Sequence, residues 1–397
     1  MATTQTDSAS SDRKILRVGI IGLGEIAQVT PHTLYPDTSN RAQVNHISML
    51  NNLSSHFQTT YLCDASPLAL AHCSKKVTAN TPKTTSNPTE LISSPLVDVV
   101  LICNANAFHA AHCILALSHN KYVLCEKPLA LNYRDIDAII AAEAKSTARV
   151  FVGYQRRYAQ AFLDAIQEVG GMSRVQYARI RDIIGPNSTF VSQSCTFPQK
   201  FSDFKNEDTE EMLARDEEMM KYALEHEYGV EAKPQAIDMA RLLASLGSHD
   251  LSTMHELLGM PTEVLGASCD LRRSPIWTVL FQYPSFPCTY ESGINNVPIF
   301  DAHVEVYSND KIVRVNYDTP YVKGLPVTMT IRERVGEGGY QERTVRKTYE
   351  DPYTLEFLEF YRVVTEGREP KTGAKDARQE VNLWKMILRK GFPFKGG

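Results

Sequence analysis

The sequence has no large excess of charge of either sign. Its 42 lysines and arginines nearly balance 46 aspartates and glutamates, which gives a formal net charge of −4. Proteins that bind nucleic acid or an acidic membrane surface carry a basic patch or a polybasic segment. The composition therefore predicts neither nucleic acid nor a membrane as a partner.

Long apolar runs are also missing. A membrane-spanning helix needs about 20 predominantly apolar residues, and in the richest stretch, residues 96–103, Asp98 interrupts the run after two residues. Residues 1–14 are rich in Ser, Thr and Asp and contain neither an apolar segment nor a small-residue cleavage site. We expect this segment to be a disordered tail rather than a secretory signal.

Cysteine pairs are absent as well. The eight cysteines are scattered and form no CxxC pair, and Cys63, Cys103 and Cys125 lie inside apolar strand-like runs. A free thiol in such a run behaves as a small apolar side chain. We therefore expect reduced cysteines and a cytoplasmic location. No Cys/His cluster has the spacing of metal ligands, so no metal site is predicted.

The first 150 residues contain an alternation of short apolar runs and helical patterns. The predicted strands are residues 16–21, 59–63, 97–103, 122–125 and 151–153, and the predicted helices are residues 108–118 and 133–145. Strands that alternate with helices form a parallel sheet covered on both faces. Right-handed crossovers then make it a doubly wound α/β Rossmann domain.

The pattern changes after about residue 155. Predicted strands at residues 175–182, 278–282, 302–307, 312–317 and 327–333 mostly alternate apolar and polar residues, and helices are predicted at 208–226, 235–258 and 376–390. Such alternation is typical of a mainly antiparallel open sheet with one solvated face. We interpret the acidic segment 203–227 as a solvated helix face. The chain then divides into the tail, a Rossmann domain over residues 15–153 and an α+β domain over residues 154–397, whose last helix can pack back on the first domain.

The first predicted strand leads into the pattern Gly22-x-Gly24-x-x-Ala27. In a dinucleotide-binding turn, the first glycine permits the tight turn, the second lets the backbone approach a pyrophosphate, and the small third residue keeps helix and strand close. The helix N-terminus supplies unpaired N–H groups and the positive end of its dipole. We predict that Gly22, Gly24, Glu25 and Ile26 bind NAD, with NADP also possible as the cofactor. The alternative is an ordinary strand–helix turn.

Asp64 follows the second predicted strand, where an acid binds the adenosine ribose hydroxyls in this type of fold. It lies 40 residues after Gly24, about twice the usual gap of roughly 20, so we expect an extra loop, at residues 36–44. The alternative is a turn or helix-capping role, since Ser66 followed by proline is itself a helix start signal. A carboxylate here repels a 2′-phosphate and favours NAD over NADP, although Ser66 and Lys75 can accommodate a phosphate.

A second motif, Glu126-Lys127-Pro128, ends the predicted strand at residues 122–125. Ligands bind at the carboxyl ends of the strands in doubly wound sheets. In combination with other segments, this motif resembles the Gfo/Idh/MocA family, named for glucose–fructose oxidoreductase, inositol dehydrogenase and a rhizopine-catabolism protein. The other blocks that carry the resemblance are the glycine turn, Asn106-x-x-His109, the segment 153–158 and Gly247-Ser248-His249-Asp250.

The resemblance implies that Lys127 reaches the nicotinamide ribose and the substrate oxygen, where its ammonium polarises a carbonyl or stabilises an alkoxide. It also implies a cis peptide bond before Pro128, which aims the lysine into the cleft. The residues implied to line the cofactor cleft or to lie near the substrate are Asn104, Asn106, His109, Glu126, Gln155, Arg156 and Arg157. The alternative for Lys127 is a solvated lysine at a strand end.

The resemblance breaks at the acid–base pair. Removing the hydroxyl proton of an alcohol needs a base, and the family commonly places Asp and His four residues apart on one helix face. His249 matches the histidine, but the position four residues before it is Ser245. His249 then acts alone or with Lys127, or Asp250 substitutes for the acid, or the reaction path differs. The other alternative for His249 is a polar helix residue bonded to a backbone carbonyl.

Substrate contacts are expected where the second sheet faces the nicotinamide. Alternation sends Arg179 and Arg181 to one face of their strand and Asp182 to the other. We add Arg181 to the substrate candidates Arg157, His249 and Asp250. The acidic segment between residues 190 and 231 is long for the family, and we expect it to cover the site.

These patterns predict an enzyme, an NAD(P)-dependent oxidoreductase that transfers a hydride between a nicotinamide cofactor and a sugar, polyol or related small hydroxy or carbonyl compound. Two alternatives stay open: an enzyme with tightly bound NAD that uses transient oxidation for a redox-neutral step, and a non-catalytic NAD(P)-binding regulator. The resemblance also implies a homo-oligomer, dimer or tetramer, formed through the C-terminal sheet.

Overall fold

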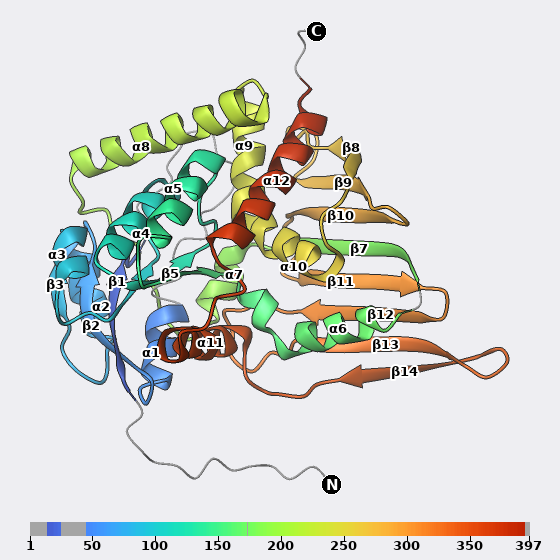
Figure 1. Cartoon of the computed structure of the whole chain (residues 1–397), viewed down its shortest axis with the longest axis horizontal. Coiled ribbons are helices and arrows are strands. Elements are labelled where there is room, and N and C mark those ends of the chain that lie inside the picture. The colour runs from blue at the N-terminus through green and yellow to red at the C-terminus, as the bar shows by residue number, and fades with distance from the viewer. Residues whose placement is uncertain (1–13, 25–44, 173, 394–397) are drawn as a thin grey trace.

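The computed structural model of this chain describes residues 14–24, 45–172 and 174–393 (Figure 1). Its first half contains a six-stranded parallel sheet with the order β3-β2-β1-β4-β5-β6. The strand order reverses between β1 and β4, the position at which doubly wound sheets bind ligands. The strands are β1 (Leu16–Ile21), β2 (Phe57–Cys63), β3 (Lys83–Thr85), β4 (Val99–Ile102), β5 (Tyr122–Glu126) and β6 (Val150–Gly153).

Helices cover both faces of the parallel sheet, because its strands send buried side chains to both sides. One cluster of buried residues joins the sheet to α3, α4 and α5, and the other joins it to α1, α2 and α11. Neighbouring residues of β1 divide between the two clusters: Ile20 belongs to the second and Ile21 to the first. The helices are α1 (Ile47–Asn52), α2 (Pro67–Ser74), α3 (Pro88–Ser93), α4 (His109–Ser118), α5 (Tyr133–Glu143) and α11 (Pro352–Glu366).

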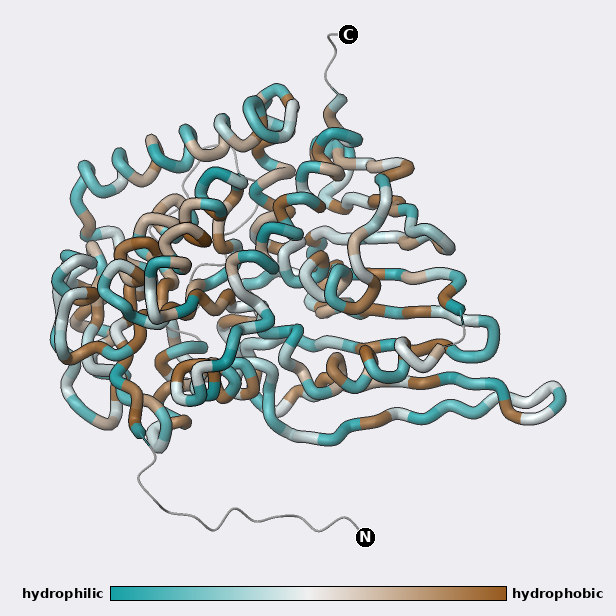
Figure 2. Tube along the Cα trace, in the orientation of Figure 1, coloured by the Kyte–Doolittle hydropathy of each residue, from teal (hydrophilic) through white to brown (hydrophobic). Residues whose placement is uncertain are grey.

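The second half contains an eight-stranded sheet with the order β14-β13-β12-β11-β7-β10-β9-β8. All neighbouring pairs are antiparallel except β10 and β7. Figure 2 shows polar and apolar residues mixed along these strands. The strands are β7 (Val175–Ile184), β8 (Glu263–Ser268), β9 (Ile276–Gln282), β10 (Pro287–Ile294), β11 (Phe300–Ser308), β12 (Lys311–Tyr317), β13 (Thr328–Val335) and β14 (Gly339–Val345).

The remaining helices lie on one side of the second sheet and between it and the first half. The last of them, α12 (Ala374–Gly391), packs against β8 and α10 and also against α5 and β6 of the first half (Figure 1). The others are α6 (Gln160–Gly170), α7 (Asn187–Ser192), α8 (Asn206–Lys221), α9 (Pro234–Leu242) and α10 (Ser248–Leu258). Shorter segments are the 3₁₀ turns η2 (Asn106–Phe108) and η3 (Gln155–Tyr158) and the π-helical segments η4 (Tyr222–Tyr228) and η5 (Leu243–Gly247).

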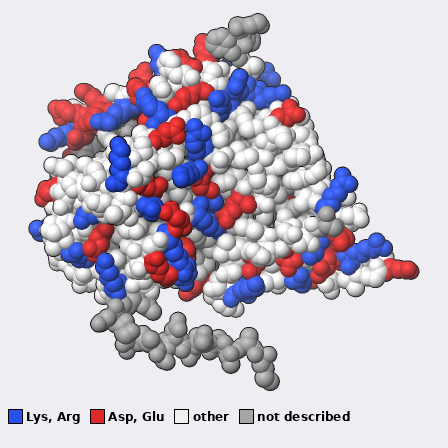
Figure 3. Space-filling view, viewed as in Figure 1, with Lys and Arg blue, Asp and Glu red and all other residues white. Residues whose placement is uncertain are grey.

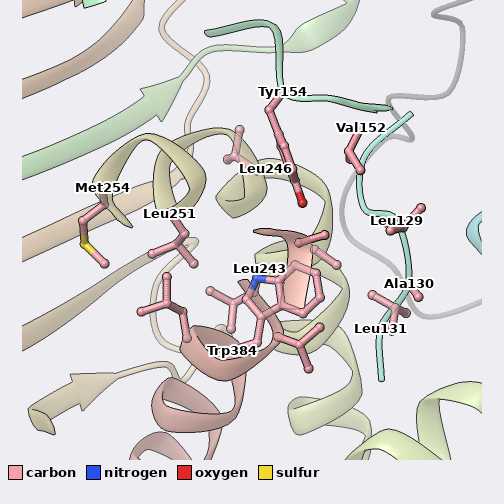
Figure 4. Packing of buried hydrophobic residues seen from close by; sticks show 14 of the residues in the cluster. Leu129, Ala130, Leu131, Val152, Tyr154, Leu243, Leu246, Leu251, Met254 and Trp384 are labelled. Carbon is pink, nitrogen blue, oxygen red and sulfur yellow. The ribbon is translucent and has the colours of Figure 1, made fainter. Parts of the chain in front are cut away.

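One apolar core continues from the first half into the second. Figure 4 shows its central part, where Trp384 of α12 lies beside Leu243 of η5, and Leu246 of η5 belongs to the same cluster. The chain that follows β5, residues 129–131, belongs to the same cluster. The segments that carry the predicted site residues therefore pack against one another in a single core.

The predicted fold class is confirmed: a doubly wound parallel sheet is followed by a mainly antiparallel open sheet. Strands β3, β8, β10 and β14 and helices α1, α2, α3, α6, α7 and α11 were not predicted. Strand β3 has three polar residues, so it carries no apolar signal. The segment 235–258, predicted as one helix, is interrupted by η5. No helix in the described ranges is long and apolar enough to cross a membrane.

Candidate functional site

The glycine turn has the geometry that its sequence predicts. Gly22 has φ +92°, and a Cβ at this position would lie 2.5 Å from the backbone nitrogen of Asn104. Any other residue would be both strained and blocked. The turn therefore holds the chain after β1 directly against the chain after β4. The predicted contacts of Glu25 and Ile26 and the small residue Ala27 lie outside the described residues, as does the loop expected at residues 36–44.

Asp64 supports this turn from the end of β2. One carboxylate oxygen accepts the backbone N–H of Leu23 at 2.7 Å, and the other accepts that of Ser66 at 2.8 Å. Burial raises the pKa of Asp64, although the two N–H groups oppose the shift. This geometry is the turn role that the sequence left as an alternative. The predicted ribose contact stays a prediction, since a carboxylate oxygen can accept more than one hydrogen bond.

The motif after β5 is buried and held in one conformation. The Lys127–Pro128 peptide bond is cis, as the resemblance implied. His109 ties this segment to the neighbouring strand end, because Nδ1 lies 2.7 Å from the carbonyl oxygen of Pro128 and Nε2 lies 3.0 Å from that of Asn104. His109 is 1% exposed. It holds two loops at the carboxyl edge of the sheet, and Asn106 begins the turn between Asn104 and His109.

Lys127 is not a solvated lysine. It is 4% exposed, and its Nζ donates a hydrogen bond to the backbone carbonyl of Ser245. Ser245 lies in the π-helical segment η5, where the helix widens. The residue that replaces the family acid therefore meets Lys127 through its main chain. π-Helical turns are rare and occur frequently at functional sites.

His249 lies in the first turn of α10, directly after η5, and is half-buried. The π-helical segment changes the simple four-residue spacing between positions 245 and 249 on which the prediction relied. The glycine at position 247, just before this helix, is explained by packing. A Cβ on Gly247 would lie 2.9 Å from the Tyr290 hydroxyl of β10. The second sheet thus packs directly against the helix that carries His249.

Glu126 has a partner that the sequence did not reveal. Its Oε1 lies 2.8 Å from Nε2 of His46, and both side chains are buried. The His46 ring also packs against Tyr353 and Phe357 of α11. No local pattern around His46 pointed to this contact, which joins residues 80 positions apart. Glu126 is therefore held by His46, the residue before α1, and α11 packs against the His46 ring.

Arg156 lies in a buried cluster of ion pairs. Its guanidinium donates to Asp250 at 2.5 Å and to Asp182 at 3.0 Å, and all three side chains are buried. Burial raises the pKa values of both aspartates, and for Asp250 the neighbouring Asp182 raises it further. Burial opposes the charge of Arg156, but the two acids raise its pKa overall. The cluster joins η3, β7 and α10, so it fixes the second sheet beside the end of β6.

The other candidates divide between the site and the rest of the molecule. Arg157 is buried and pairs with Glu256 and Asp376, which ties η3 to α10 and α12. Arg181 pairs with Asp301 in the second sheet, and alternation along β7 places it on the face opposite the buried Asp182. Arg181 is therefore not brought together with Lys127, because strand periodicity points it away from the helices.

Two buried acceptors remain at the carboxyl edge of the parallel sheet. Among the described residues, neither Oδ1 of Asn104 nor Oε1 of Gln155 has a hydrogen-bond partner. Buried polar atoms are nearly always paired, so such atoms need a donor from a ligand or water. They follow β4 and β6 and flank Lys127 along the sheet. Ribose hydroxyls and a carboxamide are donors of this type, so the residues fit a nicotinamide dinucleotide.

The acidic segment lies against the same edge of the parallel sheet. Asp203 accepts the Ser66 hydroxyl at 2.5 Å and the Leu68 N–H at 2.9 Å, at the start of α2. Glu227 accepts the N–H groups of Tyr133 and Arg134 at the start of α5. Figure 3 shows acidic side chains gathered over α8. The interpretation as a purely solvated face was incomplete, since two of these acids cap helices of the first half.

Residues 16–154 match the profile of the family described as "Oxidoreductase family, NAD-binding Rossmann fold". This match is to the Gfo/Idh/MocA family and covers the Rossmann half of the chain. A myo-inositol 2-dehydrogenase of Thermotoga maritima is 28% identical over 183 residues, which are 45% of this chain and 49% of that protein. The chain therefore matches less than half the length of this family member in sequence.

Solved structures resemble nearly the whole chain in fold. A levoglucosan dehydrogenase with NADH and levoglucosan has a TM-score of 0.66 at 15% identity, covering 95% of this chain and 97% of that one. A 3-ketoreductase of Actinomadura kijaniata with NADP has a TM-score of 0.64 at 13% identity, covering 95% and 98%. At these identities the likeness shows the fold alone. The sequence match to the family is therefore confined to the first half of the chain, whereas the likeness in fold covers both halves.

No group of three His, Cys, Asp or Glu side chains within the described ranges lies in position to hold a metal ion. Two buried acids, Asp182 and Glu380 of α12, lie near Lys127. Burial raises the pKa of Asp182 and raises that of Glu380 to about 8, and the charge of Lys127 opposes both shifts. The candidate active site is therefore a buried lysine near buried acids, at the carboxyl edge of the parallel sheet.

Proposed function

We propose that this protein is an NAD(P)-dependent oxidoreductase that transfers a hydride between the nicotinamide and a sugar, polyol or related small hydroxy or carbonyl compound. The observation that carries the proposal is Lys127, a buried lysine after β5 whose Nζ donates a hydrogen bond to the carbonyl of Ser245 in the second half. A buried charge with a perturbing environment in a cofactor-binding fold is a functional-site candidate. The bound nicotinamide supplies the hydride acceptor or donor.

The chain's own residues supply binding, orientation and charge. We propose that Gly22 and Gly24 admit the pyrophosphate, and that Asn104 and Gln155 accept hydrogen bonds from the nucleotide. Lys127 stabilises the negative charge that develops on the substrate oxygen. His249, at the start of α10, takes the hydroxyl proton during oxidation and returns it during reduction. The charge of Arg156 is already paired with Asp182 and Asp250. We therefore propose that this cluster positions the two halves of the chain relative to each other and does not contact the cofactor.

We propose NAD as the preferred cofactor, because two carboxylates lie beside the ribose site that we propose after β2. Asp64 ends β2, and Asp203 occupies the hydroxyl and N–H donors at the start of α2. Ser66, which the sequence suggested as a phosphate ligand, already donates to Asp203. A phosphate would have to displace one carboxylate and approach another.

We also propose a homo-oligomer that forms through the open face of the second sheet. That face carries a network of ion pairs, including Arg179–Glu291 and Arg181–Asp301. Measuring the mass of the purified chain in solution by light scattering tests this, and a monomer at all concentrations would exclude it.

The test of activity compares the wild type, Lys127→Ala and the control Lys390→Ala, which changes an exposed lysine at the end of α12. Each is mixed with NAD⁺ or NADP⁺ and a panel of polyols and sugars. We expect cofactor reduction by the wild type and the control, and none by Lys127→Ala with nucleotide binding retained. Binding without turnover on any substrate would favour a regulator, and substrate conversion without net cofactor change would favour a redox-neutral enzyme.

A further inference from the structure

The carboxylate of Glu126 joins His46 to the main chain of Lys127. Its Oε1 lies 2.8 Å from Nε2 of His46, and its Oε2 accepts the main-chain N–H of Lys127 at 3.2 Å. A carboxylate only accepts hydrogen bonds, so Nε2 of His46 carries the hydrogen in the first contact. A chain of two contacts therefore leads from His46 to the backbone that carries the Lys127 side chain.

Packing alone does not account for an imidazole at position 46. His46 is 0% exposed, and its ring centroid lies 5.8 Å from that of Tyr353 and 5.5 Å from that of Phe357, both on α11. A phenyl ring would fit such an aromatic site without burying polar atoms, which cost free energy unless they are hydrogen-bonded. Among the described residues Nδ1 of His46 has no hydrogen-bond partner. The contact with Glu126 is therefore what an imidazole provides here and a phenyl ring does not.

The segment after β5 is held from both faces of the parallel sheet. Helices α4 and α11 belong to the two different clusters that cover these faces. From α4, Nδ1 of His109 lies 2.7 Å from the carbonyl oxygen of Pro128. From the other face, His46 reaches Lys127 through Glu126, which is the last residue of β5 and pairs with Gly153 of β6. The two histidines thus fix the chain on either side of the Lys127 side chain.

We propose that His46 positions Lys127 through the carboxylate of Glu126. The imidazole N–H fixes the carboxylate, the carboxylate fixes the main chain at Lys127, and Nζ then meets the carbonyl of Ser245. His46 is a positioning residue, since it acts through Glu126 and Lys127. Its effect on turnover rests on the proposed function, but its effect on the position of Lys127 does not.

The position of Lys127 is tested without nucleotide, by crystal structures of the wild type, His46→Phe and His46→Gln. His46→Phe keeps an aromatic ring against α11 but removes the donor. We expect the Glu126 carboxylate to turn away from the Lys127 N–H in this variant and Nζ to leave the Ser245 carbonyl. In His46→Gln the side-chain amide can donate to Glu126 in place of Nε2, so Lys127 should keep its wild-type position. An unmoved Lys127 in His46→Phe would overturn the proposal.

The effect on turnover is measured with the substrate that the polyol and sugar panel identifies. We expect kcat of His46→Phe to fall about 100-fold, as for a misplaced catalytic group. Its KM for the cofactor should stay within a factor of about three, because the change acts on the reacting group and not on uniform binding. His46→Gln should restore kcat to within about tenfold of the wild type, since it restores the donor. A purely structural role of His46 predicts neither the split between kcat and KM nor this rescue.

The matched control is His56→Phe. The His56 ring also packs edge-on against α11, with its centroid 4.8 Å from that of Tyr361, but it hydrogen-bonds to the Ser55 hydroxyl. We expect His56→Phe to keep the wild-type kcat. An equal fall of kcat in His56→Phe and His46→Phe would assign the loss to the packing of α11 and overturn the proposal.

The two failures are distinguishable. If the wild type binds neither NAD⁺ nor NADP⁺, the proposed function fails, and the crystal structures still decide whether His46 positions Lys127. If the wild type turns over substrate and His46→Phe keeps its kcat, His46 is structural only and the inference fails alone. Should His46→Phe not fold, Glu126→Met replaces it, because it removes the acceptor from the same contacts, and the same displacement of Lys127 is expected.

Discussion

The Lys127 ammonium donates a hydrogen bond to the main-chain carbonyl of Ser245, 118 positions later in the chain. This contact joins the end of a Rossmann strand to a π-helical turn of the second half. It explains how the chain retains the family lysine without the acid of the family motif.

The choice of nucleotide is expected to depend on Asp203. Asp203→Asn removes one of two negative charges beside the proposed adenosine ribose site, so the affinity for NADP⁺ should rise about tenfold, equivalent to about 1.4 kcal/mol, while that for NAD⁺ stays within a factor of about two. Calorimetry measures both. Asp270→Asn, at a partly exposed acid paired with Arg272, is the control. An unchanged ratio of the two affinities would show that Asp203 does not select the cofactor.

The packing of Gly247 predicts a rescue experiment. Gly247→Ala brings a Cβ to 2.9 Å from the Tyr290 hydroxyl, and overpacking of this kind costs about 1–3 kcal/mol. The Tyr290 hydroxyl has no hydrogen-bond partner among the described residues. Adding Tyr290→Phe should therefore recover most of the lost free energy of unfolding, measured by urea denaturation. Additive losses in the double variant would mean that the strain lies in the helix backbone.

Removal of Arg156 should destabilise the fold strongly. Arg156→Met leaves two buried aspartates without their cation, and breaking a buried ion pair in this way costs about 3–5 kcal/mol. Arg272→Met is the control, because Arg272 is exposed and pairs with a surface acid, and it should change the free energy of unfolding by less than about 0.5 kcal/mol. Equal stability of the two variants would contradict the role given to this cluster.

The raised pKa of Glu380 also predicts how stability depends on pH. The folded protein holds this proton up to about pH 8, whereas an unfolded glutamate loses it near its ordinary pKa of 4.5. Glu380 therefore lowers the free energy of unfolding as pH rises between these values, by at most about 1.4 kcal/mol per unit. Glu380→Gln should remove this contribution, so its stability relative to the wild type should increase from pH 5 to pH 8. A constant difference would contradict the raised pKa.

Local motifs predicted the parts of the site that each depend on a few consecutive residues. Gly22 has the predicted conformation because a tight turn after β1 leaves no room for a side chain. The cis bond before Pro128 and the burial of Lys127 also agree with the motif. Apolar periodicity predicted the two sheets for the same reason, since strand and helix patterns repeat over short distances.

The remaining parts depend on contacts between distant segments. Glu380 is 226 positions from Tyr154, and Asp203 is 137 positions from Ser66. Nothing in the residues around either acid shows what lies opposite in the fold. The π-helical segment η5 was missed because its apolar residues continue the helical pattern on both sides. Arg156 was expected near the cofactor, but two buried acids from other elements neutralise it.

The most direct test of the central claim is the equilibrium binding of NAD⁺, NADH and NADP⁺ to the purified chain and to Lys127→Ala, measured by calorimetry or by fluorescence transfer to NADH. The account predicts that the wild type binds NAD⁺ and NADH more tightly than NADP⁺, and that Lys127→Ala retains binding. Absence of binding of all three nucleotides to the folded wild type would contradict it.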